Sequence, residues 1–250
     1  MPIFANYPSL KDKSVFITGG ATGIGASLVE HFVRQGARVG FVDIDDTAAQ
    51  ALIGALPAKP TYRHADIRDV GALQAAIIAF AGNGQVDVLV NNAGNDNRHA
   101  VEAVDAAFWD DAMAVNLRPH FFAAQAVRAG MARAGGGSII NLGSIVVQMS
   151  AGDAPAYVTA KAGVHGLTRA LARDFGQDRI RVNCVMPGWI MTERQKRLWL
   201  DESGERRIAE RQCLPDRLEP EDVARMVLFL AADDSLHCTA QSFIVDGGWV

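Results

Sequence analysis

The chain has 250 residues, of which 49% are hydrophobic and 21% are charged. This is the composition of an ordinary globular protein with one sizeable core. The net charge is −4 and the isoelectric point is near 5.9, which speaks against nucleic acid or an anionic membrane as a partner. We expect a single domain over residues 1–250. We expect no disulfide framework, because the cysteines are isolated and odd in number: Cys184, Cys213 and Cys238.

Targeting and metal signals are not evident either. Residues 1–14 show no basic segment followed by an apolar one, so no signal peptide is expected. No apolar run reaches the roughly 18 residues of a membrane helix. The histidines have no metal-site spacing, so no metal is expected. Reduced cysteines are typical of the cytoplasm, which is the predicted location.

Short apolar runs alternate with longer helical patterns. In chain order we predict a strand at 14–18, a helix at 24–35, strands at 38–42 and 61–65, a helix at 69–81, a strand at 86–90, a helix at 109–133, a strand at 137–142, a helix from 155, a strand at 181–185, a helix at 221–231 and a strand at 242–245. This alternation predicts an α/β fold in which helices cover both faces of a parallel sheet. The charged stretch 189–218 is predicted to be a long irregular lid.

A glycine-rich turn follows the first strand. The stretch TGGATGIG covers residues 18–25, with glycines at positions 19, 23 and 25. Glycine allows a tight turn and a close approach to a pyrophosphate, and the next helix presents free amides to that anion. A turn without a ligand is the alternative. The order of strand, glycines and helix near the start of a βαβ unit favours dinucleotide binding.

The second strand ends in an acidic residue, Asp43, eighteen residues after Gly25. An acidic residue at about this spacing typically binds the adenosine ribose hydroxyls. The alternative is a helix N-cap, and we assign that role to Asp45 or Asp46. No lysine or arginine follows Asp43 and Thr22 is neutral, so NAD is predicted rather than NADP.

Tyr157 and Lys161 lie four residues apart in a predicted helix, downstream of Ser144 at a strand end. Side chains at this spacing leave the same face of a helix. The ammonium is expected to lower the pKa of the phenol, so that it can accept a proton. The alternatives are a surface pair for Tyr157 and Lys161 and a turn hydroxyl for Ser144.

These features resemble the short-chain dehydrogenase/reductase family over essentially the whole chain. The resemblance rests on TGGATGIG, the acidic end of the second strand, Asp66-Ile67, NNAG at 91–94, Asn116, Ser144, the Tyr157–Lys161 pair, Pro187-Gly188 and DGG at 246–248. It implies a seven-stranded Rossmann sheet, a nicotinamide cofactor and a homotetramer.

The resemblance also implies roles for individual residues. Tyr157 is the acid/base, Lys161 holds the nicotinamide ribose, Ser144 orients the reacting oxygen, and Asn116 anchors a water that relays protons to Lys161. Alternatively, Asn116 caps or bends its helix. The implied cofactor-binding residues are Gly19, Thr22, Gly23, Ile24, Gly25, Asp43, Asp66, Ile67, Asn92, Ala93, Gly94, Tyr157, Lys161, Ile190 and Thr192. The alternatives are ordinary turns for NNAG and Pro187-Gly188, and a helix cap for Asp66.

Three stretches, at 95–99, 189–195 and 212–214, resemble the sugar (aldose) 1-dehydrogenases of the family, the branch that oxidises D-xylose and related aldoses. The resemblance implies oxidation of an anomeric hydroxyl to a lactone. The substrate-binding residues expected are Asn95, Ser144, Gln148, Tyr157 and Trp189. Arg194 could also supply a hydrogen bond to the sugar. The alternative, expected for most of the lid arginines, is that they are solvated: Arg194, Arg197, Arg206, Arg207 and Arg211. The alternatives are a carbonyl, 3-ketoacyl, polyol or sugar-acid dehydrogenase or reductase, and a cofactor-binding protein without catalysis.

Overall fold

The computed structural model describes residues 4–250. Residues 1–3, which belong to the predicted domain and to the segment searched for a signal peptide, lie outside the described residues. One parallel sheet of seven strands has the order β3-β2-β1-β4-β5-β6-β7. The strands are β1 (Ser14–Thr18), β2 (Arg38–Asp43), β3 (Thr61–His64), β4 (Val88–Asn91), β5 (Gly137–Leu142), β6 (Ile180–Pro187) and β7 (Ser242–Val245). The predicted fold class is confirmed.

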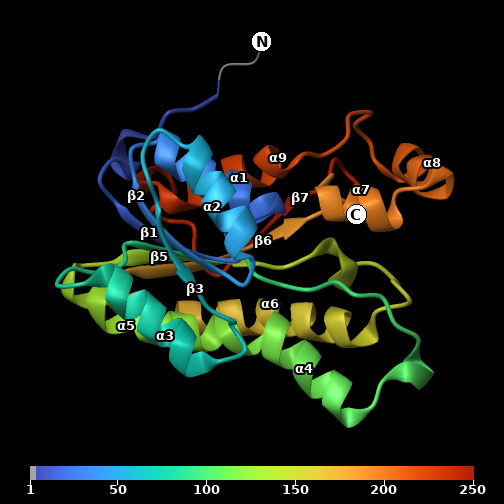
Figure 1. Ribbon diagram of the computed structural model, residues 1–250, viewed down its shortest axis with the longest axis horizontal. Coiled ribbons are helices and arrows are strands. Elements are labelled where there is room, and N and C mark those ends of the chain that lie inside the picture. The colour runs from blue at the N-terminus through green and yellow to red at the C-terminus, as the bar shows by residue number, and fades with distance from the viewer. Residues whose placement is uncertain (1–3) are drawn as a thin grey trace.

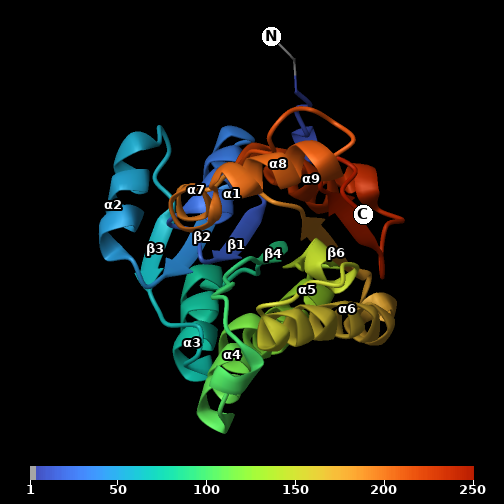
Figure 2. The ribbon, with the colours of Figure 1, turned by 90° about the vertical axis from the view of Figure 1, so that its right-hand side faces the viewer.

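Helices cover both faces of this sheet. They are α1 (Gly23–Arg34), α2 (Asp46–Ala55), α3 (Val70–Ala81), α4 (Ala106–Asn116), α5 (Arg118–Arg133), α6 (Pro155–Phe175), α7 (Glu193–Trp199), α8 (Glu202–Arg211) and α9 (Pro220–Ala231). In both ribbon views α1, α2 and α9 lie on one side of the sheet and α3, α4, α5 and α6 on the other (Figures 1 and 2).

The core consists of an apolar layer on each side of the sheet. Along β1, Val15 and Ile17 pack in the layer beneath α1 and α9, whereas Phe16 packs in the opposite layer with α3 and α5. This alternation follows from the two-residue period of a strand. The central strands are buried on both faces, which explains why they read as continuous apolar runs.

The single helix predicted at 109–133 is wrong. The structure has two helices, α4 and α5, which are separated at Leu117, whose φ of −134° and ψ of −54° are not helical. Pro119 stands in the first turn of α5 and has no amide hydrogen to continue the ladder of α4. The break makes Asn116 the last residue of α4.

The segment 189–218 is also more regular than predicted, because it contains α7 and α8. The side chains of Thr192 and Asp201 cap these two helices by accepting hydrogen bonds from the amides of Gln195 and Gly204. A parallel bridge between Ile190 and Leu218 closes the base of the segment. Both helices lie beyond the carboxyl end of β6 (Figure 1).

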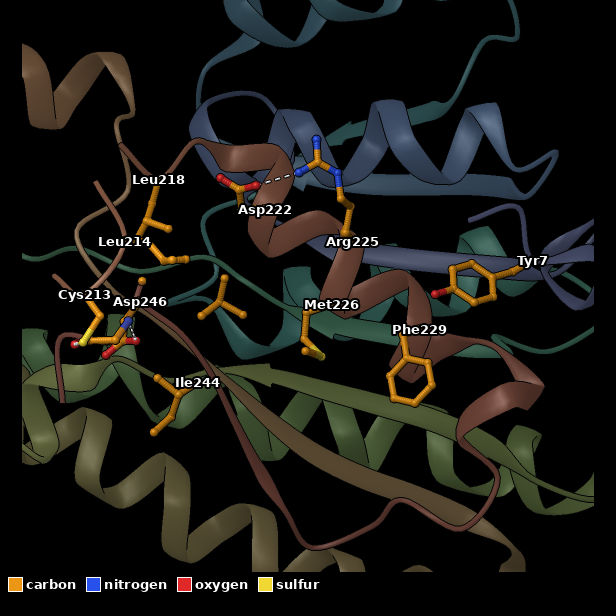
Figure 3. Close-up of a pocket in the computed structure, with 13 residues that line it drawn as sticks. Tyr7, Cys213, Leu214, Leu218, Asp222, Arg225, Met226, Phe229, Ile244 and Asp246 are labelled. Carbon is orange, nitrogen blue, oxygen red and sulfur yellow. Dashed lines mark hydrogen bonds and ion pairs between the residues drawn. The ribbon is translucent and has the colours of Figure 1, made fainter. Parts of the chain in front are cut away.

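A groove of about 700 Å³ lies between α9 and the edge strand β7, and Tyr7 closes one end of it (Figure 3). Met226 and Phe229 of α9 face Ile244 of β7 across this groove. The exposed Leu214 lies at its margin.

Candidate active site

The carboxyl ends of β1 and β4 are joined by side-chain hydrogen bonds. The Thr18 hydroxyl accepts from the amides of Asn92 (3.0 Å) and Ala93 (3.1 Å). The Asn92 amide group donates to the carbonyls of Thr18 and Gly19 at 3.0 and 2.8 Å. The strand order reverses between β1 and β4, which is where open α/β sheets bind their ligands. The structure thus places NNAG directly beside the glycine turn.

The glycine turn has no room for side chains at two positions. Gly19 has a φ of +66°, and a Cβ atom there would lie 2.8 Å from the Cα of Ala93. A Cβ on Gly25 would lie 1.8 Å from the carbonyl oxygen of Gly19. The Thr22 side chain does not cap α1, so no N-cap side chain accepts from the amides of its first turn. This arrangement suits an anion at the helix N-terminus.

Asp43 is fixed at the end of β2 by three backbone amides. One carboxylate oxygen accepts from Ala21 at 2.9 Å, and the other accepts from Ile44 and Asp45 at 2.8 and 3.1 Å. Its carboxylate therefore lies beside the glycine turn. Asp45 caps α2 by accepting from the amide of Ala48 at 2.9 Å, as predicted for Asp45 or Asp46.

Asp66 does not cap α3, because Asp69 holds that position. The Asp66 carboxylate pairs with Arg68, which lowers the pKa of Asp66, and Arg68 reaches on to Asp111 at 3.0 Å. The neighbouring Ile67 is buried. The helix-cap alternative for Asp66 is excluded by these contacts.

Tyr157 and Lys161 leave the same face of α6, as predicted. The Nζ atom of Lys161 lies 5.7 Å from the centre of the Tyr157 ring and donates to the carbonyl of Leu142 at 2.7 Å. Lys161 is only 3% exposed, so the surface-pair alternative is wrong. A Cβ on Gly94 would lie 3.4 Å from this Nζ atom and 3.1 Å from Oδ1 of Asn116. The side chains of Tyr157, Lys161 and Asn116 therefore lie close together beside Gly94.

Asn116 has all its side-chain hydrogen bonds directed at backbone. Its Oδ1 accepts from the amide of Asn95 at 2.8 Å, and its Nδ2 donates to the carbonyls of Asn95 and Ala112, both at 3.1 Å. A cavity of about 50 Å³ adjoins Asn116 and Tyr157 and is also lined by His99 and Asp111. It is large enough for about one water molecule.

Two contacts position the helix that carries the catalytic pair. The His99 Nε2 atom accepts from the amide of Ala156 at 3.3 Å, in the first turn of α6. Further along, Thr168 accepts from Asn141, whose Oδ1 accepts from Asn91 at 2.9 Å. These buried polar contacts tie α6 to β4 and β5. Sequence reasoning missed them because they join residues far apart in the chain.

The charges at the site oppose a low pKa for the tyrosine. Burial raises the pKa of Tyr157, the carboxylate of Asp96 raises it further, and the Ser144 hydroxyl beside it lowers it. Burial also lowers the pKa of Lys161 to about 8. Burial dominates for the chain alone, so the pKa of Tyr157 is raised, and the lowering expected from Lys161 stays a prediction.

The predicted substrate residues make contacts within the protein. Oδ1 of Asn95 accepts from Arg194 at 3.3 Å, and the amide of Gln148 lies 4.0 Å from the sulfur of Met186. The indole nitrogen of Trp189 donates to Gln195 at 3.0 Å. The structure joins Asn95 and Trp189 through α7, whereas Gln148 lies against β6.

The cofactor residues predicted after β6 have different surroundings. Ile190 is buried and 4% exposed, next to the bridge that closes the segment 189–218. Thr192 reaches the glycine turn, because a Cβ on Gly23 would lie 3.1 Å from its methyl group. Only Thr192 of these two thus borders the turn directly.

The Arg194 side chain is 42% exposed, as expected of a solvated lid residue, and it also contacts the protein. Its guanidinium donates to Asp96 at 3.2 Å and to Asn97 at 2.6 Å, both in the loop after β4. Arg98 of this loop stacks over the ring of Trp199 in α7 at 4.1 Å. No local sequence pattern indicates these contacts, because they join segments about a hundred residues apart.

Two kinds of feature are not found in residues 4–250. None of the helices there is long and apolar enough to cross a membrane. The same residues contain no group of three or more His, Cys, Asp or Glu side chains that could hold a metal ion.

The parallel sheet, the glycine turn and the pair of half-buried Tyr157 and buried Lys161 together define a Rossmann-fold oxidoreductase. A family model described as enoyl-(acyl carrier protein) reductase matches residues 19–250. The chain is 50% identical over 248 residues to D-xylose 1-dehydrogenase of Caulobacter vibrioides, covering 98% of both chains. It is 50% identical over 249 residues to a probable galactose dehydrogenase of Rhizobium meliloti, covering 98% of this chain and 97% of the other.

A solved short-chain type dehydrogenase/reductase from Mycobacterium ulcerans superposes with a TM-score of 0.90 at 29% identity, covering 98% of this chain and 91% of that one. The chain belongs to the short-chain dehydrogenase/reductase family. It is a dehydrogenase that acts on CH–OH groups, and membership implies a nicotinamide cofactor.

Proposed function

We propose that this protein oxidises the anomeric hydroxyl of an aldose to a lactone, with NAD as the electron acceptor. Two relatives that are 50% identical over nearly the whole chain are named for xylose and galactose oxidation. The observation that carries the proposal is the convergence of Tyr157, Lys161 and Asn116 beside Gly94, at the carboxyl end of the sheet.

The residues present fit a nicotinamide dinucleotide. The absence of Cβ atoms at Gly19 and Gly25 lets the turn pack tightly, next to the first turn of α1, which no Thr22 side chain caps. The pyrophosphate would lie on this turn and the adenosine ribose on Asp43. The remaining contacts would come from residues around these two points: Thr22, Ile24, Asp66, Ile67, Asn92, Ala93, Gly94, Tyr157, Lys161, Ile190 and Thr192.

The cofactor, when bound, supplies the acceptor for the hydride that leaves the anomeric carbon. Tyr157 removes the proton from the anomeric hydroxyl, so that the carbonyl of the lactone can form. Ser144 donates its single hydroxyl hydrogen to the reacting oxygen. Before substrate binds, the same hydroxyl lowers the pKa of Tyr157. Lys161, held on the Leu142 carbonyl, carries the positive charge nearest to the phenol ring.

Preference for NAD over NADP follows from the surroundings of Asp43. Its carboxylate is fixed by three backbone amides and has no cation among the groups that contact it. A 2′-phosphate would meet this carboxylate, and Asp45 and Asp46 lie next in the chain. Like charges at contact distance cost up to several kcal/mol, and ~1.4 kcal/mol is tenfold in affinity.

A substrate panel tests the proposal. The purified protein is incubated with NAD and, in separate reactions, with aldoses, polyols, a sugar acid and a 3-hydroxyacyl thioester, while the absorbance of the reduced cofactor is followed. We expect the highest kcat/KM for an aldose. The highest value for any other class would support another dehydrogenase of the family, and no turnover would support a cofactor-binding protein without catalysis.

We also infer that the segment 189–218 acts as a lid and that the protein is a cytoplasmic homotetramer. The lid role is supported by the hydrogen bonds of Arg194 across to the loop after β4. Assembly is supported by the edge strand β7, where Ile244 is 39% exposed beside the apolar groove of Figure 3. Trp249 is half-buried against Trp189, which leaves part of the indole for a subunit contact. The three cysteines are free, as is usual in the cytoplasm.

A further inference from the structure

One carboxylate near the catalytic pair has no role in the mechanism above. Asp96 lies in the loop after β4, and both of its oxygens contact the first turn of α7. Oδ1 accepts from Nε of Arg194 at 3.2 Å, and Oδ2 accepts from the amide of Gln195 at 2.5 Å. The two segments are almost a hundred residues apart in the chain. They meet because both lie at the carboxyl end of the sheet.

The position of Asp96 is costly for proton transfer. Its charge raises the pKa of both Tyr157 and Lys161. A negative charge close to a general base opposes the ionisation of that base. A neutral asparagine could also contact Arg194, as the neighbouring Asn95 and Asn97 do. Asp96 thus opposes ionisation of the phenol but favours the charged form of Lys161, and the proposed mechanism gives its carboxylate no task.

The carboxylate also has acceptor capacity to spare. An ionised carboxyl group offers about four acceptor positions, and the contacts with Arg194 and Gln195 occupy two of them. The Asp96 side chain is 32% exposed, so a ligand can reach it. Hydroxyl groups on neighbouring carbons of a sugar are donors that suit such a group, because hydrogen bonds to a charged acceptor are short and strong.

We propose that Asp96 is the specificity-determining residue of the site, and that it accepts hydrogen bonds from the sugar hydroxyls on the second and third carbons while Arg194 and Gln195 hold it in position. This inference rests on the proposed aldose oxidation. Gln195 also accepts from the indole of Trp189, so the same contact sets the position of that ring. Closure of the lid then completes the sugar-binding site.

Deoxy sugars provide the test. The kcat/KM of the wild type and of Asp96→Asn is measured with D-xylose and with its 2-deoxy and 3-deoxy analogues, at saturating NAD. Glu193→Gln is the matched control, since Glu193 is the adjacent lid carboxylate, is 93% exposed and pairs with Lys196. Circular dichroism and the thermal midpoint establish that each variant is folded.

We expect the wild type and Glu193→Gln to lose at least about tenfold in kcat/KM with one of the deoxy sugars, because a site built to bind a hydroxyl rejects the analogue that lacks it. In Asp96→Asn this penalty should shrink to less than about threefold, with the KM for NAD unchanged. Arg194→Met keeps the carboxylate but removes its support. We expect this second variant to raise the KM for D-xylose and leave the KM for NAD unchanged.

The outcomes separate the inference from the function on which it rests. If the wild type oxidises aldoses and Asp96→Asn keeps the full deoxy penalty, Asp96 does not recognise the sugar and only this inference is overturned. If Asp96→Asn raised the KM for NAD as much as the KM for D-xylose, this inference would also be overturned. The residue would then affect the whole site and not sugar recognition alone. If the wild type oxidises no aldose, the proposed function and this inference fall together.

Discussion

At the scale of single residues, the half-buried phenol of Tyr157 carries the chemistry in the proposed mechanism. We expect Tyr157→Phe to keep the fold and the binding of NAD, because the ring that packs in the site is retained. Turnover should fall by ~10²–10⁴-fold, the usual contribution of an acid/base group. Steady-state kinetics and a cofactor titration measure the two effects separately. A kcat close to that of the wild type would rule out the assigned acid/base.

The pH dependence of the reaction follows from the pKa directions of the same residue. Burial raises the pKa of Tyr157, so its proton-accepting form is populated at alkaline pH and the rate of oxidation should rise there. The Ser144 hydroxyl lowers this pKa, and its removal in Ser144→Ala should move the alkaline limb of kcat/KM to higher pH. A profile of kcat/KM against pH for both proteins checks this. A limb at the same pH in both would show that Ser144 does not act on the phenol.

We propose that Asp43 determines the choice of cofactor. We expect kcat/KM for NAD to exceed that for NADP by at least about tenfold, because a 2′-phosphate meets a fixed carboxylate. Asp43→Ala should reduce this ratio. Initial rates with both cofactors provide the measurement, with Asp12→Ala, an exposed substitution in the loop before β1, as the control. Equal use of both cofactors by the wild type would contradict the ribose role.

At the scale of elements, the junction between β1 and α1 depends on the absence of a side chain at Gly25. A Cβ there would lie 1.8 Å from the carbonyl oxygen of Gly19, so Gly25→Ala must shift the turn, and we expect NAD affinity to fall at least tenfold. Gly54 in α2 is a suitable comparison, because a Cβ on it meets no atom within 4 Å. Gly54→Ala should stabilise the protein by ~0.5–1 kcal/mol. Calorimetry and a cofactor titration of both variants test the contrast.

The elements also show what a sequence pattern can and cannot reveal. The apolar periodicity of α4 and α5 is continuous and predicts one helix. The sequence pattern does not distinguish a proline in the first turn of a new helix from a proline inside a helix. Only the backbone at Leu117 shows the break, and the break places the Asn116 side chain on the loop carbonyl of Asn95. The helices α7 and α8 were missed because charged residues obscure their periodicity.

At the scale of the whole molecule, the fold and most of the nucleotide site were predictable, because they depend on local motifs. The glycine turn, the acidic end of β2 and the Tyr157–Lys161 spacing each lie within a few residues. Contacts between distant segments were not predictable. The pairing of Asp96 with Arg194 depends on how β4 and β6 are placed in one sheet, and no local pattern encodes it.

Assembly is a property of the same scale. We expect light scattering at micromolar concentration to give about four times the 26.8 kDa of one chain. Ile244→Glu should weaken assembly, because it places a charge on an exposed apolar position of the edge strand β7. A monomer for the wild type, or an unchanged mass for the variant, would contradict a subunit contact at this edge.

The central claim is that the protein oxidises a sugar at its anomeric carbon, and product analysis tests it most directly. D-Xylose labelled with carbon-13 at the anomeric position is incubated with the protein and NAD, and the label is followed by nuclear magnetic resonance. We expect a lactone signal, followed by the open acid as water hydrolyses it, in a one-to-one ratio with reduced NAD. An unchanged anomeric signal while NAD is reduced would show oxidation at another carbon and would contradict the claim.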